Sequence, residues 1–271
     1  MGTQFVEVEH RGDVEWIFFN DFEKTLAGAD ADTVDIHTAI AHAMHEARFD
    51  SSRVVVLTGR EDGGFYSVPS ADHYSLPAHR DRVNPLKRPA GFTGAHPDVI
   101  ETLAFMEKPI VARVNGDVIG FGQSVLWGCD IIVAREDAVI ADVHTGQGDV
   151  IDSRGVNIGF PQAISPGDGA MAFFPLFLPP TKLKEYMLLS RTYTTKDLER
   201  MNVVNYAVPA AELDAKVDEI VNQLLARPSY VLGHVKRLCN KHLITQLNTA
   251  RDLSAAYEVN DLWQHAKDGT M

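Results

Sequence analysis

The sequence predicts an α/β fold with a helical C-terminal region, on three observations. Short apolar runs typical of buried strands alternate with amphipathic helical stretches through the first two-thirds of the 271 residues. From Gly169 onward the pattern is mostly helical. No Pro/Ser/Gly-rich linker or charge block divides the chain, so we expect one fold, with a core over residues 1–200 and a helical region over residues 201–271.

The α/β part contains elements in a regular order. A strand at Val14–Phe19 precedes an amphipathic helix over residues 33–49, whose apolar side chains recur every three or four positions. Residues 54–58, Val-Val-Val-Leu-Thr, are apolar enough for a strand buried on both faces. The sequence then predicts helices at 97–106 and 122–128, and strands at 110–114, 131–134 and 139–141.

The C-terminal part is predicted to be helical with one interruption. Apolar periodicity indicates helices at 181–190, 211–226, 228–242 and 249–266, and a short strand at 203–208.

Composition excludes several function classes. A net charge of −12 repels phosphate backbones and argues against nucleic-acid binding. No apolar run approaches the roughly 18 residues of a membrane span, and the first ten residues lack the pattern of a secretory signal. Cys129 and Cys239 lack the spacing of a zinc or redox motif. We therefore expect a cytoplasmic protein without a metal requirement, a nucleic-acid partner or a membrane partner.

Residues 108–134 carry the most informative motif, Lys-Pro-Ile-Val-Ala-Arg-Val-Asn-Gly-Asp-Val-Ile-Gly-Phe-Gly-Gln-Ser-Val-Leu-Trp-Gly-Cys-Asp-Ile-Ile-Val-Ala. A glycine turn that opens a helix lets a ligand oxygen approach backbone N–H groups polarised by the helix dipole. The segment resembles the signature of the enoyl-CoA hydratase/isomerases of the crotonase superfamily. The resemblance implies a spiral of ββα turns, C-terminal helices that assemble trimers or hexamers, and a backbone oxyanion hole.

The resemblance also assigns the two oxyanion donors. The middle residue of the glycine turn, Phe121, would give one N–H. The second donor precedes an Asp after a strand, and the segment ending in Asp72 is similar. Pro69 has no N–H, which leaves Ala71 if Asp72 sets the register, or Ser70 if Tyr66 does. Each such donor typically contributes roughly 3 to 4 kcal/mol.

The catalytic side chains depart from an ordinary hydratase. Its two water-activating glutamates correspond by position to Ser124 and His144. His144 together with Asp168 in a Pro-Gly-Asp-Gly turn resembles the β-diketone hydrolases of this superfamily, such as 6-oxocamphor hydrolase. In those enzymes an Asp-oriented His activates the water that cleaves a C–C bond, and neutral imidazole suits that task. The alternatives are a helix-capping role for Asp168 and a core role for His144.

Three further features bear on the site. Glu258 falls where some family members bring a carboxylate over the active site, although surface glutamates are common on helices. The stretch 145–165 is longer than in those hydrolases, and we expect a lid or a second carboxylate for His144. A basic cluster would bind the phosphates of coenzyme A, unless it is a solvated loop: Arg80, Arg82, Lys87 and Arg88.

Three functions follow as hypotheses. The first is hydrolytic C–C cleavage of a β-diketone or β-keto thioester. The second is hydration or isomerisation of an acyl-CoA with non-standard catalytic groups, in which coenzyme A is part of the substrate and no other cofactor is required. The third is a scaffold that binds an acyl-CoA or a protein without turnover.

Overall fold

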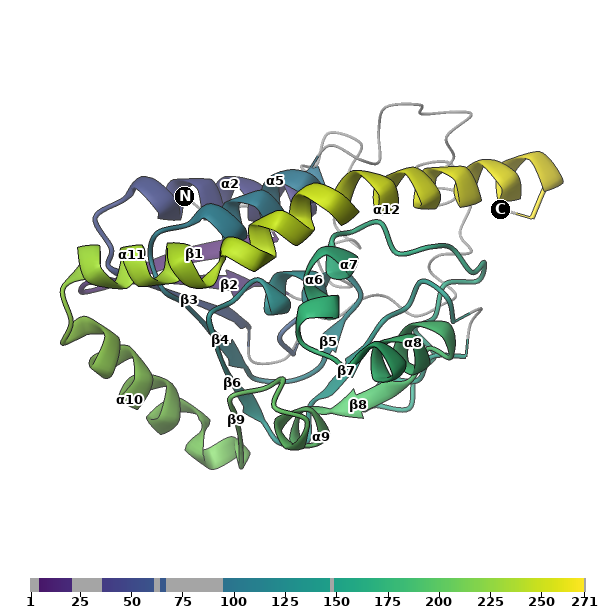
Figure 1. The fold of residues 1–271 in the computed structure, drawn as a ribbon. Coiled ribbons are helices and arrows are strands. Elements are labelled where there is room, and N and C mark those ends of the chain that lie inside the picture. Colours follow the sequence, from purple (N-terminus) through teal and green to yellow (C-terminus); the bar gives the residue numbers. More distant parts are fainter. Residues whose placement is uncertain (1–4, 21–35, 61–63, 67–94, 147–148, 271) are drawn as a thin grey trace.

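The computed structural model describes residues 5–20, 36–60, 64–66, 95–146 and 149–270 (Figure 1). Its main sheet has six strands in the order β1-β2-β3-β4-β6-β9, all parallel except for the antiparallel pair β1 and β2. The strands are β1 (Val6–Arg11), β2 (Val14–Phe19), β3 (Val54–Gly59), β4 (Ile110–Val114), β6 (Ile131–Arg135) and β9 (Tyr206–Val208). A second sheet contains β5 (Val118–Ile119), β7 (Val139–Ala141) and β8 (Thr192–Thr194).

Helices cover both faces of the main sheet, which explains why β3 is buried throughout. Val55 and Leu57 share a core cluster with α2 (Ile36–Phe49) and α5 (Ala95–Phe105). Val54 and Val56 point the other way, into a cluster with α10 (Leu213–Leu225). Successive side chains of a strand alternate between faces, so a continuous apolar run is the pattern that two covered faces require.

The remaining helices are short, except at the C-terminal end. They are α6 (Phe121–Trp127), α7 (Ala170–Phe173), α8 (Pro180–Leu188), α9 (Thr195–Arg200), α11 (Ser229–Cys239) and α12 (Lys241–Asp268), with 3₁₀ turns at Phe174–Leu176 and Ala210–Glu212. In the described part of the chain, none of the helices is both long and apolar enough to span a bilayer.

The C-terminal helices are fastened to the sheet by a buried ion pair. Lys236 of α11 lies 2.7 Å from Asp130 and donates to the carbonyl oxygen of Lys108 at 2.9 Å. From there α12 runs back across α5 and α7 (Figure 1). α12 therefore crosses the middle of the molecule, and its C-terminal end projects at the periphery (Figure 1).

Most of the predicted helices and strands are confirmed. The structure differs from the prediction at one polar strand and in the bounds of two C-terminal elements. β1 was not expected, because Val-Glu-Val-Glu-His-Arg is a polar edge strand that pairs only with β2. The helix expected at 249–266 extends over Lys241–Asp268, since no Gly or Pro interrupts it. The strand expected at 203–208 is limited to Tyr206–Val208.

Candidate active site

The glycine turn sits where β5 leads into α6. Gly120 has φ 56° and ψ −125°, a conformation essentially restricted to glycine, and its N–H donates to the Ala141 carbonyl oxygen at 3.0 Å. Phe121 is the first residue of α6, and its ring packs edge-on against His37 and Tyr66, with centroids 4.6 Å and 6.2 Å away. The turn thus has the predicted form, and the oxyanion role of the Phe121 N–H stays a prediction.

The other predicted binding groups lie outside the described residues. These are the second oxyanion donor, Ser70 or Ala71, and the basic cluster of Arg80, Arg82, Lys87 and Arg88.

His144 is buried just beyond β7, and Asp142 holds it. The imidazole Nδ1 is 3.1 Å from both carboxylate oxygens of Asp142, and the backbone N–H of His144 donates to Oδ1 of Asp142 at 2.9 Å. An anionic acceptor at Nδ1 keeps a proton on that nitrogen. Sequence reasoning missed Asp142, although it stands two residues before the histidine in an extended segment, a spacing that puts both side chains on one face.

The Asp142 carboxylate also accepts a hydrogen bond at the end of a buried chain of side chains. The amide nitrogen of Gln123 donates to Oδ2 of Asp142, and the amide oxygen of Gln123 accepts from the Tyr186 hydroxyl at 2.8 Å. Burial raises the pKa of Tyr186 well above its usual range, so its hydroxyl remains a donor. Asp142 is therefore held in place from α6 and α8.

Asp168 faces the opposite nitrogen of the imidazole. Its Oδ2 is 4.0 Å from Nε2 of His144, and this buried oxygen has no hydrogen-bond partner among the described residues. Its Oδ1 accepts from the Ser124 hydroxyl at 2.9 Å and from the Ala170 N–H at 3.2 Å. Asp168 thus caps α7 and faces His144 at once. The prediction that Asp168 orients the imidazole by a hydrogen bond is therefore wrong, because Asp142 makes that bond.

Glu258 reaches the same cluster from α12. The side chain is buried, and it lies so close to Gly167 that a β-carbon there would be 2.0 Å from its Oε2. Burial raises the pKa of Glu258 to about 8, although the His144 charge opposes this shift. The surface alternative for Glu258 is therefore wrong, and its carboxyl group is protonated at neutral pH.

The carboxylates determine the charge of His144. Burial lowers the pKa of the imidazole, but Asp142, Asp168 and Glu258 outweigh burial and raise it to about 10. Burial raises the pKa of Asp168, and the His144 charge opposes that shift. At neutral pH the imidazole is consequently a cation. This corrects the expectation of a neutral imidazole in the resting site.

A cavity of about 480 Å³ opens beside this cluster. It lies between the Gly167–Gly169 turn, α5 and α12, and its polar lining includes Asp168 and Glu258. The full lining comprises Ile100, Gly167, Asp168, Gly169, Arg251, Asp252, Ala255, Ala256, Glu258 and Val259. A small molecule in this cavity would contact both carboxyl groups.

The long stretch 145–165 packs against His144 in its described part. The N–H groups of Phe160 and Ile164 donate to the carbonyls of Val143 and His144 at 3.1 and 2.8 Å, and the Phe160 ring lies edge-on to the imidazole at 5.2 Å. Asp152 bonds within the loop, to Arg154. The carboxylate on Nδ1 of His144 therefore comes from Asp142 and not from this stretch, whose role as a lid stays a prediction.

Gly167→Ala is expected to displace Glu258 from the cluster. The added β-carbon would meet the Glu258 carboxyl oxygen at 2.0 Å and its β-carbon at 2.8 Å, so the glutamate must move. In a pH titration followed by NMR of the carboxyl carbons, the wild type should show the Glu258 carboxyl group titrating near pH 8, and Gly167→Ala should not. Gly155→Ala meets no atom within 4 Å but has a φ of +76°, so it controls for the destabilisation of a glycine substitution that does not touch Glu258. An unchanged Glu258 titration in Gly167→Ala would contradict the packing.

Comparisons with known proteins give the family. The enoyl-CoA hydratase/isomerase family model matches residues 33–269. The probable enoyl-CoA hydratase EchA12 of Mycobacterium tuberculosis is 30% identical over 216 residues, which cover 78% of this chain and 68% of that protein. The putative enoyl-CoA hydratase/isomerase YngF of Bacillus subtilis is 25% identical over 220 residues, 79% of this chain and 75% of YngF.

Solved structures agree on the fold. An enoyl-CoA hydratase/isomerase from Mycobacterium paratuberculosis superposes with a TM-score of 0.76 at 21% identity, covering 96% of this chain and 94% of that one. A β-diketone hydrolase from the cyanobacterium Anabaena gives the same TM-score, 0.76, at 22% identity and with the same coverage, 96% and 94%. The fold, the glycine turn before α6 and the family match agree: the chain belongs to the enoyl-CoA hydratase/isomerase family of the crotonase superfamily.

Proposed function

We propose that the protein hydrolyses a C–C bond of a β-diketone, using a water molecule bound between His144 and Asp168. The observation that carries this proposal is the 4.0 Å separation of Nε2 of His144 and the unpartnered Oδ2 of Asp168 at the cavity. Two atoms at this separation both come within hydrogen-bond distance, about 2.7 to 3.2 Å, of one water oxygen.

The charges assign a role to each group. Asp168 accepts the proton of the attacking water, and its raised pKa makes it a better base than an ordinary carboxylate. The water oxygen bonds to the carbonyl carbon, and the N–H of Phe121 stabilises the resulting oxyanion. Collapse breaks the adjacent C–C bond and releases a carboxylic acid and an enolate. Glu258 gives its proton to the enolate carbon, and the His144 cation stabilises the ionised carboxylates.

Two observations support a hydrolase over an ordinary hydratase. Ser124 and His144 occupy the positions of the two glutamates that the family resemblance assigns to hydration, and here they contact or face Asp168. The Anabaena structure of the same fold is named a β-diketone hydrolase.

A second candidate is hydration or isomerisation of an acyl-CoA. The names of the sequence relatives favour it, since they include enoyl-CoA hydratases and a carnitinyl-CoA dehydratase. In that case Glu258 would exchange a proton with the acyl chain, and the predicted phosphate contacts of Arg80, Arg82, Lys87 and Arg88 would hold coenzyme A.

A substrate panel distinguishes these functions. Cyclic β-diketones and enoyl-CoA esters are tested against the wild type and His144→Ala, with ring opening or hydration followed by mass spectrometry. Ring opening that incorporates one oxygen from ¹⁸O-water and is lost in His144→Ala is the expected result. Turnover of enoyl-CoA esters alone would replace the hydrolase proposal by the second candidate. Binding of acyl-CoA without turnover of any compound would identify the scaffold.

The pH dependence of kcat should report the Glu258 proton. Because Glu258 must be protonated to act as the acid, kcat should fall about tenfold per pH unit above the pKa of about 8. Glu258→Gln should lower the plateau of kcat and remove this decline near pH 8, leaving only the decline at the His144 pKa, which falls below its wild-type value of about 10 because the Glu258 charge that helps to raise it is lost. Rates measured from pH 6 to 11 test this. A wild-type profile that stays flat to pH 10 would assign the proton to another donor.

We also propose that the exposed apolar faces of α11 and α12 form subunit contacts in a trimer or hexamer. Apolar side chains at least 40% exposed there include Tyr230, Val235, Leu238, Tyr257 and Trp263. Analytical ultracentrifugation measures the assembly, and a monomer at micromolar concentration would refute it.

A further inference from the structure

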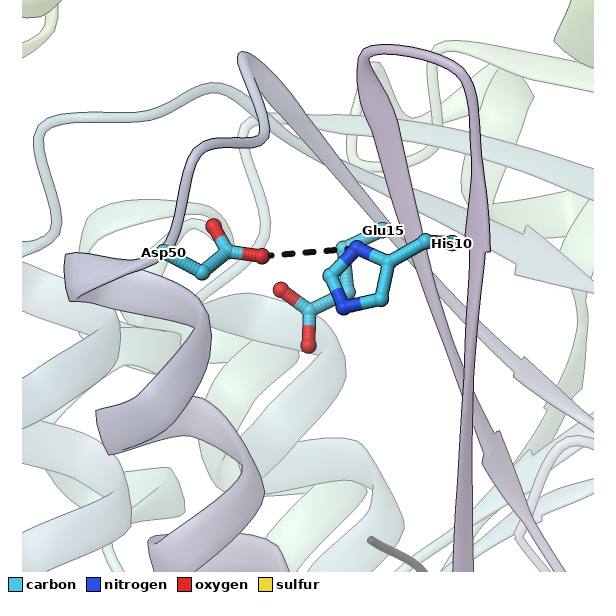
Figure 2. A group of neighbouring side chains, drawn as sticks. All are labelled: His10, Glu15 and Asp50. Carbon is cyan, nitrogen blue, oxygen red and sulfur yellow. Dashed lines mark ion pairs between the residues drawn. The ribbon is translucent and has the colours of Figure 1, made fainter.

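A second cluster of charged side chains lies at the β1–β2 hairpin, where β1 forms an edge of the main sheet. His10 and Glu15 are directly paired across β1 and β2, and Asp50 follows the last turn of α2. One ligand atom from each residue lies within 4.8 Å of the other two (Figure 2). None of its three residues lines the cavity beside Asp168 and Glu258, so the two sites are separate.

Two carboxylate oxygens in this cluster lack hydrogen bonds. Glu15 is only 2% exposed, and neither its Oε2 nor Oδ2 of Asp50 has a hydrogen-bond partner among the described residues. Figure 2 shows the Glu15 carboxyl group directed into the space between Asp50 and the His10 ring. A buried anionic oxygen without a partner costs several kcal/mol, so such groups normally bind a cation or a proton.

The other carboxylate oxygen of Asp50, Oδ1, accepts hydrogen bonds from Ser52 and Lys108, which lie outside the cluster. Oδ1 accepts from the Ser52 N–H at 3.0 Å, from the Ser52 hydroxyl at 2.7 Å and from the Lys108 ammonium group. These bonds fix the carboxylate with Oδ2 directed toward His10, whose Nδ1 is 3.6 Å away. Outer donors that orient one oxygen while the other remains available are typical of metal-binding carboxylates.

We propose that His10, Glu15 and Asp50 form a binding site for a divalent transition-metal ion such as Zn²⁺. One imidazole nitrogen and two carboxylate oxygens match the ligands of Zn²⁺, whereas Ca²⁺ and Mg²⁺ prefer oxygen ligands alone. The His10 side chain is 57% exposed, so an ion can enter from solvent and keep a water in the fourth position. The bound ion would join the β1–β2 hairpin to the junction of α2 and β3, which makes the site structural.

The competing arrangement is a proton shared between the two carboxyl groups. Burial and the neighbouring Asp50 raise the pKa of Glu15 to about 8, so a Glu15 proton directed at Asp50 would also satisfy both oxygens. The presence of His10 favours the metal ion, because a shared proton requires no third ligand. The two arrangements differ in whether His10 and Zn²⁺ affect the protein.

Zn²⁺ titration of chelator-treated protein tests the site. Isothermal calorimetry should show saturable binding of one Zn²⁺ that weakens more than about tenfold in His10→Ala and in Glu15→Gln, since even outer-shell losses cost about 10- to 100-fold. At 100 times Kd, Zn²⁺ should raise the Tm of the wild type by about 5 °C or more. His242→Ala, an exposed histidine of α12, is the matched control and should bind like the wild type.

The His10 side chain is mostly exposed, so His10→Ala should retain the wild-type circular dichroism spectrum, and a change in Zn²⁺ binding can be assigned to the lost imidazole. Zn²⁺ bound elsewhere would bind all variants alike. Equal Zn²⁺ affinity and equal Tm shifts in the wild type, His10→Ala and Glu15→Gln would overturn the proposal in favour of the shared proton. None of these readouts uses enzymatic activity, so they are independent of the proposed hydrolase function.

Discussion

Asp168→Asn is expected to lower kcat for a hydrolysed β-diketone by about 10²- to 10⁴-fold, the usual contribution of a positioned base. The amide cannot take up the water proton, and it places a neutral group 4.0 Å from the His144 cation. Its oxygen can still accept from Ser124 and Ala170, so the cap of α7 is retained and the protein should fold. Single-turnover rates with the best substrate of the panel measure the effect.

The matched control makes the same substitution on the rim of the same cavity. Asp252 lines the cavity, but its side chain is 85% exposed and pairs with Arg251. Asp252→Asn should change kcat less than about threefold, because exposed ion pairs typically contribute under about 1 kcal/mol. Equal losses in both variants would indicate a general effect of cavity charge, and an unaffected Asp168→Asn would exclude Asp168 as the base.

Asp142→Asn is expected to have a comparable effect on kcat, through His144. Both oxygens of Asp142 accept hydrogen bonds, from the His144 N–H and from the amide nitrogen of Gln123. An asparagine must direct its NH₂ group at one of these donors, which leaves a buried mismatch costing about 1 to 3 kcal/mol of stability. It also removes an anion from His144. We expect kcat to fall about 10²- to 10⁴-fold, as when such a carboxylate is lost from a catalytic histidine.

The pKa of His144 provides a direct measure of the loss of the Asp142 charge. NMR titration of the His144 ring nitrogens should show a wild-type pKa of about 10 and a lower value in Asp142→Asn, since Asp142 is the largest of the carboxylate contributions that raise it. Asp137→Asn provides a comparison at an exposed acid just before β7. A His144 pKa that is the same in Asp142→Asn and wild type would show that Asp142 does not determine its charge.

The part of the site that one continuous sequence motif forms, residues 108–134, was predictable from the sequence. The glycine turn, β4, α6 and β6 appear where residues 108–134 predict them, because glycine positions and buried strands are local properties. His144, Asp168 and Glu258 were found through positional resemblance, and the structure brings them into one buried cluster, from which Asp168 and Glu258 line the cavity. The cluster's electrostatics required coordinates, since the His144 charge depends on three carboxyl groups that are up to 114 positions away in sequence.

Asp142 and the Zn²⁺ site illustrate what sequence alone does not reveal. Asp142 stands two residues from His144, but an acid near a strand end has no distinctive pattern, and its role depends on Gln123 and Tyr186 behind it. His10, Glu15 and Asp50 have no motif spacing. They meet because β1 is an edge strand of polar composition, the one strand of the main sheet that the apolar patterning does not predict.

The position of Glu258 on α12 sets the order in which the protein can acquire activity. α12 follows every other described element in the chain, and its carboxyl group is the proposed proton donor. During synthesis, the sheet, the glycine turn and the His144 cluster emerge from the ribosome before residue 258 does. A nascent chain at that stage also lacks the α12 residues that line the cavity, from Arg251 to Val259, so the substrate cavity and the proton donor are completed together when α12 docks.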